Sequence, residues 1–499
     1  MLLGLAPATD YLRAAEGLQA EGNEAAALRV LGRGAARHPG HYDLQFHFAV
    51  QLHASGDTEA ALAAFLDAAV ADPSAIAPHA RMARVFAEEG DWEAVTEACR
   101  AALSLNPRDE EMQRRLDEAQ ARAAPDAQGA GAGYDDRMDI SRLGAFSQTY
   151  SEARGKFLAA AKARHLSVRS YMNPAEGPSG EGLWADAIVL GSDAATKVLI
   201  ANSATHGAEG FCGSAALVDW LQAEQPEPPD GVRLVLIHAI NPFGFAWLRR
   251  VTEDNIDLNR NFLADFDDPP ANADYGALHE HLLVGGGAQP DWPAAKAALD
   301  AYAAEHGEFA MQGALSRGQY AHADGLFYGG AGPGWSNRTF RAILDEMVSG
   351  AEHVAFIDFH TGLGPFGHAE LISKCDPDDP EFQRLLAWFG PSVKTSAAGE
   401  STSPMLSGLI AGAVRALAPP GTVSAITAEF GTYPLWDVLR ALQQDNWLHA
   451  SGRVDTPEGE RIKRNLKEIF YPDHDDWREL VLVRARQLIR NGLAGLDAL

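Results

Sequence analysis

Residues 197–224 read KVLIANSATHGAEGFCGSAALVDWLQAE, and this stretch joins an apolar run to a helical pattern through a short loop. The run KVLIAN has the length and the Val, Leu and Ile content of a strand that is buried on both faces. The segment GSAALVDWLQAE follows it with the pattern of a helix. The stretch therefore predicts a strand followed by a helix, which is the alternation typical of α/β domains.

The same alternation extends along the chain from about residue 140. Further apolar, strand-like runs are DAIVLGS from Asp186, VRLVLIHA from Val232, HVAFIDF from His353 and VSAITAEF from Val423. Helical patterns such as NRTFRAILDEMV lie between them. Near-continuous apolar strands between helices predict a mixed sheet flanked by helices on both faces. Ligands of such sheets bind where loops leave the carboxyl ends of strands, so polar residues at those places are candidates for function.

Before residue 140 the sequence repeats with a period of 34 residues. Three sets keep this spacing: Ala15, Ala49 and Ala83; Gly22, Gly56 and Gly90; Pro39, Pro73 and Pro107. Alanine lets two helices approach closely, glycine adopts a left-handed turn at little cost, and proline ends a helix. The pattern resembles the tetratricopeptide repeat, and the resemblance implies an all-α solenoid over about residues 8–120.

These patterns divide the chain into three parts. We expect a helical repeat domain over residues 1–121, a flexible linker over residues 122–139, and an α/β domain over residues 140–499. The linker prediction rests on its Ala, Gly and Pro content and its lack of large aliphatic residues. The concave face of a repeat solenoid would bind a protein partner or support self-association. The alternative is an array that only packs against the neighbouring domain.

Composition excludes several classes of function. The chain has 41 Lys and Arg against 68 Asp and Glu, a net charge of −27, which argues against nucleic acids and anionic membranes as partners. No apolar stretch approaches the roughly 20 residues that span a bilayer, and the N-terminal segment lacks the basic start of a secretory signal. The three cysteines lie far apart and form no CxxC pair. We therefore expect a cytoplasmic protein.

His206 and Glu209 form an HxxE pair in the loop after the run KVLIAN. Imidazole and carboxylate both suit zinc, and a turn can direct them toward one point. His360 follows the run HVAFIDF and precedes a glycine-rich loop. Three such ligands leave one coordination position open, as in catalytic zinc sites. The alternatives are a glutamate favoured by a helix dipole and a hydrogen-bonded core histidine.

Two further motifs carry groups that suit amide chemistry. The loop NPFGFAWLRRVTEDNIDLNRNF, residues 241–262, follows the strand VRLVLIHA. Its adjacent Asn259 and Arg260, with Arg250 upstream, offer a fork for a carboxylate, unless the loop is a surface loop whose arginines pair with acidic neighbours. Glu429 ends the run VSAITAE. A carboxylate there can act as a general base, or it can simply cap a turn.

The order of these motifs resembles the zinc metallocarboxypeptidase family: HxxE, then NPxG with a downstream DLNRNF, then a strand-end histidine and a strand-end glutamate. That family also takes in succinylglutamate desuccinylases and aspartoacylases. The segments HGAEGFCGS, QYAHADGLFYGG and DFHTGLGPFG are similar to a bacterial branch without an assigned function. The resemblance covers about residues 140–495. It implies that residues 140–499 form a zinc carboxypeptidase-like catalytic domain with one Zn²⁺ per chain.

The resemblance also implies roles for single residues. The zinc ligands would be His206, Glu209 and His360, and Asp257 would hydrogen-bond the first of these and fix its tautomer. The remaining matches are Asn259 and Arg260 for a substrate's terminal carboxylate, Arg250 for the scissile carbonyl with Arg249 as its alternative, and Glu429 for the general base. The family's tyrosine over the substrate has no single match; Tyr320, Tyr328 and Tyr433 are the candidates.

Three functions remain open at this point. The first is a carboxypeptidase-like hydrolase, a metallopeptidase acting on a peptide or a modified peptide. The second is a deacylase of small N-acyl amino acids, for which the long insertion at residues 262–335 would narrow the site. The third is a repeat-based scaffold that carries a silenced hydrolase fold, against which the intact metal and base motifs argue.

Overall fold

The structure, a computed structural model, describes most of the chain. The described residues are 7–20, 22–72, 75–105, 110–123, 143–223, 227–282, 292–390, 392–399, 401, 403–419 and 421–499. The chain divides into two compact units, one comprising the residues up to 143 with the short segment 389–392, and the other residues 144–388 and 393–499. Among the described residues, no helix is long and apolar enough to cross a membrane.

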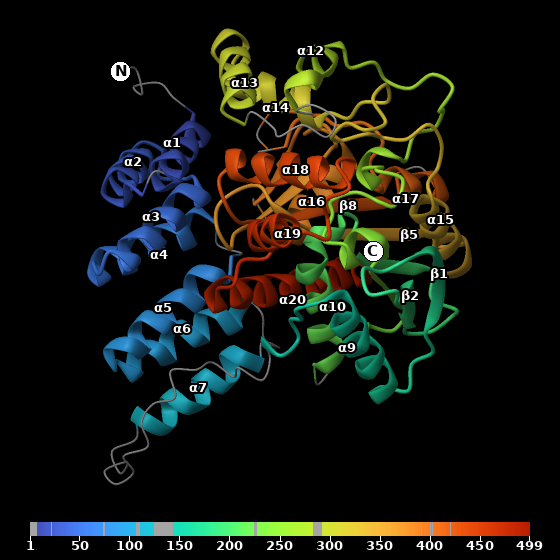
Figure 1. The fold of residues 1–499 in the computed structure, drawn as a ribbon. Helices are drawn as coiled ribbons and strands as arrows, with labels where there is room; N and C mark the ends of the chain where they lie inside the picture. The colour runs from blue at the N-terminus through green and yellow to red at the C-terminus, as the bar shows by residue number, and fades with distance from the viewer. Residues whose placement is uncertain are drawn as a thin grey trace. The chain divides into compact units, whose positions relative to one another are not determined.

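The first unit is helical throughout its described part (Figure 1). Its helices are α1 (Ala8–Ala20), α2 (Glu24–Arg37), α3 (Tyr42–Ala54), α4 (Thr58–Ala71), α5 (Ala77–Glu89), α6 (Trp92–Leu105) and α7 (Glu110–Ala123). The turns of the first three helix pairs contain the periodic glycines Gly22, Gly56 and Gly90, at φ of 72°, 84° and 76°. The periodic alanines Ala15, Ala49 and Ala83 are buried.

Periodic glycines and alanines therefore have the conformation and the burial that the sequence predicted, and the all-α character of this region is confirmed. Pro73, Pro107 and residues 124–142, which include most of the predicted linker, lie outside the described residues. The assignment to the tetratricopeptide repeat stays a prediction.

The second unit is built on an eight-stranded mixed sheet in the order β1-β2-β4-β3-β5-β8-β6-β7. Its strands are β1 (Arg169–Glu176), β2 (Gly182–Leu190), β3 (Lys197–Asn202), β4 (Val232–His238), β5 (His353–Gly362), β6 (Ala369–Ser373), β7 (Val393–Thr395) and β8 (Val423–Gly431). Strands β4, β3, β5 and β8 run parallel, while β2 pairs with β4 and β6 pairs with β8 in antiparallel fashion. The predicted mixed sheet is confirmed.

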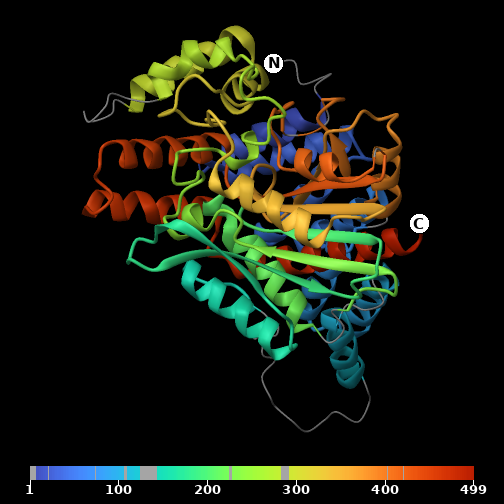
Figure 2. The ribbon, with the colours of Figure 1, turned by 90° about the vertical axis from the view of Figure 1, so that its right-hand side faces the viewer.

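Helices cover both faces of this sheet (Figures 1 and 2). The longer helices are α9 (Tyr150–Ala163), α10 (Gly210–Gln222), α12 (Ala273–Leu282), α13 (Trp292–His306), α14 (Glu308–Ser316), α15 (Trp335–Met347), α16 (Pro380–Phe389), α18 (Leu435–Ala450), α19 (Pro457–Phe470) and α20 (Asp475–Asp497). Shorter ones are η2 (Gly207–Glu209), α11 (Pro242–Ala246), η3 (Leu258–Arg260) and α17 (Ala411–Leu417).

The core explains why the central strands are apolar along their whole length. Helices α10 and α20 pack on one face, where Leu199 and Ile357 approach the backbone of Gly492 in α20. Helices α15 and α17 pack on the other face, where Phe356 belongs to a buried cluster with Phe340 of α15. Each such side chain contributes about 1.5–3 kcal/mol when it is fully buried. The parallel strands β3, β5 and β8 thereby hold their carboxyl ends side by side, which is where the predicted site residues lie.

Candidate active site

Two adjacent parallel strands deliver the predicted metal ligands. The loop after β3 carries His206 and leads into the short helix η2, which ends at Glu209, while His360 lies near the end of β5. Asn202 at the end of β3 is level with Asp358 in β5, so the two segments leave the sheet together. The loop also needs its glycine: a Cβ at Gly207 would lie 1.9 Å from the backbone of Gly244.

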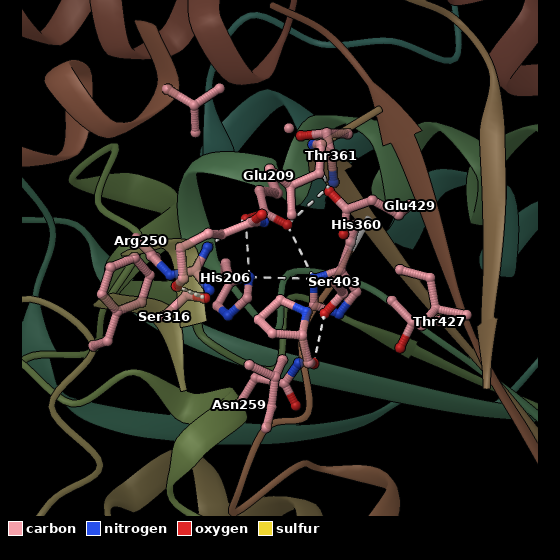
Figure 3. A pocket seen from close by; sticks show the side chains of 18 of the residues that line it. His206, Glu209, Arg250, Asn259, Ser316, His360, Thr361, Ser403, Thr427 and Glu429 are labelled. Carbon is pink, nitrogen blue, oxygen red and sulfur yellow. Dashed lines mark hydrogen bonds and ion pairs between the residues drawn. The ribbon is translucent and has the colours of Figure 1, made fainter. Parts of the chain in front are cut away.

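The structure brings His206, Glu209 and His360 into one buried cluster (Figure 3). Nδ1 of His206 lies 2.9 Å from Oε1 of Glu209, and Nδ1 of His360 lies 3.0 Å from Oε2 of the same carboxylate. The two Nδ1 atoms are 3.2 Å apart. All three side chains are at most 4% exposed. Four potential ligand atoms therefore converge on one small volume.

Each histidine also contacts an aspartate carboxylate through its Nε2 atom, which is the ring nitrogen that does not face Glu209. Oδ1 of Asp257 lies 3.1 Å from Nε2 of His206, as the family resemblance implied for this residue. Oδ2 of Asp358 lies 2.6 Å from Nε2 of His360. These contacts favour the tautomers in which each Nε2–H donates to its carboxylate, so that both Nδ1 lone pairs point into the cluster.

This donor set fits a divalent cation. Two imidazole lone pairs and a carboxylate converge, and the space between the two Nδ1 nitrogens holds at most one proton. Nitrogen and oxygen ligands of this kind suit zinc. Burial alone lowers the pKa of His360, but Asp358 and Glu209 outweigh burial and raise that pKa well above its usual range. A positive charge is therefore favoured at the centre of the cluster, and a metal ion supplies it more fully than a proton.

Glu429 lies beside the metal-ligand cluster on the neighbouring strand. In the register of β5 and β8 it is opposite His360, and its Oε1 accepts a hydrogen bond from the backbone N–H of Leu363 at 3.0 Å. Burial and the nearby charge of Glu209 raise the pKa of Glu429 to about 7. A carboxylate with this pKa both accepts and releases a proton near neutral pH.

Arg250 connects the cluster to the arginine-rich loop. Its Nε donates to Oδ2 of Asp257 at 2.9 Å and its Nη1 donates to Oε1 of Glu209 at 3.1 Å. Its guanidinium also lies over the ring of Phe327. The arginine is thus held at the edge of the cluster, next to a carboxylate that could ligate metal.

Asn259 and Arg260 lie farther along the same loop and line the same pocket. The Arg260 guanidinium donates from Nε and Nη2 to the carbonyl oxygen of Ser316, at 2.9 and 2.6 Å, and from Nη1 to the carbonyl oxygen of Asn259. Oδ1 of Asn259 accepts from the backbone N–H of Ile410 at 3.0 Å. Because carbonyl oxygens are neutral, the charge of Arg260 is not compensated by its hydrogen-bond partners.

Arg249 does not line the pocket. Its Nε donates to Asp445 at 3.3 Å and its Nη2 donates to Asn255 at 3.0 Å, which gives it a structural role in this loop. The adjacent arginines are therefore not interchangeable.

None of the three candidate tyrosines lines the pocket in the described part of the chain. The hydroxyl of Tyr320 donates to the backbone of Arg260, and that of Tyr433 donates to Glu468. Tyr328 is buried and its backbone carbonyl accepts from Asp257. The structure therefore gives no match for the family's tyrosine among them.

These residues surround one pocket. His206, Glu209, His360 and Glu429 line it together with Arg250 and Asn259 (Figure 3), and Arg260 belongs to the same lining. Apolar side chains such as Leu406, Leu439 and Leu442 fill much of the remaining wall. A largely apolar cleft with a few convergent polar groups is typical of small-ligand and peptide sites.

Comparisons with known proteins identify the family of this chain. A protein family described as "Protein of unknown function (DUF2817)" matches residues 146–484, which is more than half of the chain. The chain belongs to this family. The DUF2817 family is thus the functionally unassigned branch that the motifs resemble. A search of curated proteins found no match.

Solved structures similar to this DUF2817 chain include bovine thrombin-activatable fibrinolysis inhibitor in complex with tick carboxypeptidase inhibitor, with 12% identity over 70% of this chain and 99% of that chain and a TM-score of 0.32. A succinylglutamate desuccinylase from a Silicibacter species has 16% identity over 61% and 65% of the two chains and a TM-score of 0.30. Murein-tripeptide amidase MpaA from Escherichia coli O157 has 15% identity over 62% and 94%, with a TM-score of 0.28. At TM-scores this low the likeness says nothing about activity.

Sequence reasoning missed several groups of the site. Asp358 stands two residues before His360 on the same strand, and the two-residue period of a strand was the available indication that both face one side. Gln312 and Ser316, from the insertion 262–335, line the pocket without a motif that marks them. Lys374, which follows β6, also lines the pocket and was not predicted.

Proposed function

We propose that this DUF2817 chain is a zinc-dependent hydrolase that cleaves an amide bond next to a free carboxylate, in the manner of a carboxypeptidase acting on a peptide or a modified peptide. The observation that carries the proposal is the convergence of two histidine Nδ1 atoms and the carboxylate of Glu209, with the carboxylate of Glu429 beside them. Three protein ligands and one open position are the pattern of catalytic zinc sites.

His206, Glu209 and His360 would hold the metal, and Asp257 and Asp358 would orient the two imidazoles. When bound there, zinc lowers the pKa of water and polarises a carbonyl group. Glu429 takes the proton from the attacking water and returns it to the leaving nitrogen, a role that its position opposite His360 on the neighbouring strand supports.

Arg250 and Arg260 contact different parts of the substrate. Arg250 sits next to Glu209 and stabilises the charge that develops on the scissile carbonyl oxygen. Arg260 and Asn259 bind the substrate's free carboxylate, because Arg260 is buried and the carbonyl oxygens that accept its hydrogen bonds are neutral. A guanidinium in this state gains a strong, charge-assisted partner when a carboxylate enters.

A deacylase of small N-acyl amino acids is the second candidate. The insertion 262–335 contributes Gln312, Ser316 and Phe327 to the pocket wall. The insertion thus forms part of the pocket wall, as a site for a small substrate requires. Both candidates place a free carboxylate beside the cleaved amide.

The domain organisation belongs to the same proposal. Residues 1–121 would form tetratricopeptide repeats that bind a protein partner or a second copy of the chain, residues 122–139 would link the parts, and residues 140–499 would carry catalysis. All proposed site residues lie beyond residue 143, in the second unit.

The proposal is tested by hydrolysis assays on the full chain, freed of metal with a chelator and then reloaded with zinc. The substrates are N-acyl amino acids and short peptides with free carboxyl ends. We expect cleavage only after reloading, and the preferred substrate set separates deacylase from carboxypeptidase action. Cleavage that is unaffected by metal removal, or no cleavage of either set by the zinc-loaded chain, would refute the proposal.

A further inference from the structure

A turn over residues 247–250 follows α11 and leads the two adjacent arginines to different partners. Arg249 stays outside the pocket lining, whereas Arg250 donates to Glu209 in the metal-ligand cluster. Leu248, which precedes both arginines in this turn, has a φ of 49°, a left-handed conformation that residues other than glycine rarely adopt. Such a conformation persists only where the surrounding contacts hold it.

Lys463 of α19 supplies contacts that hold this turn. Its Nζ donates to the carbonyl oxygen of Trp247 at 2.7 Å and to that of Leu248 at 3.1 Å. These two carbonyl groups lie on either side of the Cα atom of Leu248, so one ammonium group fixes both peptide units of the left-handed residue. The lysine therefore acts on the backbone of the turn and not on its side chains.

The lysine is itself fixed from α18, which packs beside α19 (Figure 1). Its Nζ donates to Oδ1 of Asp445 at 2.5 Å and lies 2.7 Å from Nε2 of His449. Burial lowers the pKa of His449 to about 3, so the ring is neutral and accepts a hydrogen bond from the ammonium. The other oxygen of Asp445, Oδ2, accepts from Nε of Arg249 at 3.3 Å. One carboxylate thus connects the lysine to the first arginine of the turn.

These charged groups are shielded from water. The side chains of Lys463, Arg249 and Asp445 are 12%, 7% and 5% exposed. Hydrogen bonds between ionised groups are stronger in such surroundings than in water, and their geometry is correspondingly well defined. The network is therefore suited to hold the turn in one place.

On its other side the turn contacts the loop that carries the metal ligands. The backbone N–H of Ala208 donates to the carbonyl oxygen of Arg249 at 2.8 Å, and that of Gly207 donates to the carbonyl oxygen of Arg250 at 3.2 Å. The turn is thus held between Lys463 and the ligand loop. A shift of its backbone would move the Arg250 guanidinium relative to the cluster.

We propose that Lys463, held by Asp445, is a positioning residue that fixes the turn at residues 247–250 and thereby keeps Arg250 in place beside the metal-ligand cluster. The inference rests on the proposed function, in which Arg250 stabilises charge on the scissile carbonyl oxygen. Lys463 does not line the pocket, so it acts through Arg250 and not on the substrate.

The test measures the kinetics of Lys463→Met in the zinc-loaded full chain, on the substrate that the wild type cleaves best. This variant removes the ammonium and leaves Asp445 paired with Arg249. We expect kcat and kcat/KM to fall together by about 10- to 100-fold, because a small misplacement of a group that acts in the transition state has an effect of this size. Zinc content should stay at one equivalent. Asp445→Asn, which loosens the lysine from its other side, should lower kcat in the same way.

Lys467→Met is the matched control, because Lys467 lies one turn further along α19 and donates to Gln148 instead of to the turn. It should keep the wild-type kcat. In an Arg250→Ala background, Lys463→Met should lower kcat by less than about threefold, since its effect passes through the missing guanidinium. A purely structural lysine would cause the same loss in both backgrounds. Equal losses, or a folded Lys463→Met variant with wild-type kcat, would overturn the inference.

Hydrogen exchange separates this inference from the proposed function, because it needs no turnover. Peptides that span residues 241–252 should exchange faster in Lys463→Met than in the wild type and in Lys467→Met. If Lys463→Met does not fold, the same comparison is made with Asp445→Asn. Faster exchange in a chain that cleaves no substrate would support the hold of Lys463 on the turn and refute the proposed hydrolase function. Unchanged exchange would overturn the inference, whether or not the wild type is active.

Discussion

Asp358 offers the sharpest structural test of how the metal-ligand cluster works. Its Oδ2 lies 2.6 Å from Nε2 of His360, and its Oδ1 accepts from Nδ2 of Asn202 and Oγ1 of Thr205, both at 2.8 Å. In Asp358→Asn the amide keeps the size of the carboxylate. If the amide oxygen continues to accept hydrogen bonds from Asn202 and Thr205, the NH₂ group faces Nε2 of His360.

An NH₂ group in that place favours the tautomer of His360 that is protonated on Nδ1. That proton points at the cluster and competes with zinc. Loss of such an orienting carboxylate typically weakens metal affinity by about 10- to 100-fold, which corresponds to about 1.4–2.8 kcal/mol. We expect a loss of this size, with the fold retained.

The assay is competition for zinc against a chromophoric chelator, with the melting temperature as a check on folding. Asp445→Asn is the control, because Asp445 is equally buried but pairs with Arg249 and Lys463 away from the cluster. It should lower stability and leave the zinc dissociation constant unchanged. A wild-type zinc affinity in a folded Asp358→Asn variant would show that Asp358 does not set the tautomer of His360.

Two further predictions concern chemistry and recognition. Glu429→Gln should bind zinc normally and lose most of kcat, because an amide cannot take up the proton; a near-normal kcat with zinc present would exclude Glu429 as the base. Substrates with an amidated terminal carboxyl should be cleaved at least about 30-fold more slowly than free acids. Arg260→Ala should erase most of that difference while the variant still binds zinc. Equal rates for blocked and free substrates would show that Arg260 does not bind the terminal carboxylate.

The parts of the fold that the sequence predicted well are those whose pattern follows from burial alone. Strands β3, β4, β5 and β8 are covered on both faces, so their apolar runs were visible without any knowledge of their neighbours. The edge strand β1 has mostly exposed or half-buried side chains, and β7 has only three residues, Val393–Thr395. Neither strand has a residue pattern that differs from the pattern of a loop.

For the site, the sequence predicted residues whose positions follow from a strand end, and it left alternatives open where tertiary geometry decides. His206, Glu209 and His360 come together because β3 and β5 are parallel neighbours. The choice between Arg249 and Arg250 depends on the path of an irregular loop, in which Leu248 has a φ of 49°.

Lys374 escaped prediction for a similar reason. It reaches the pocket only because β6 returns antiparallel beside β8, and that pairing leaves no mark in the residues themselves. Pairing between distant strands is set by the whole sheet, so a single sequence does not reveal it.

Zinc content tests the central claim most directly. The full chain, the variants His206→Ala and His360→Ala, and the control His322→Ala, whose side chain lies outside the pocket lining, are dialysed against trace zinc and analysed by elemental mass spectrometry. We predict one equivalent of zinc in the wild type and in His322→Ala, and almost none in the other two, because two remaining ligands hold the ion poorly. A full equivalent in either His206→Ala or His360→Ala, or no zinc in the wild type, would contradict the proposed metal centre.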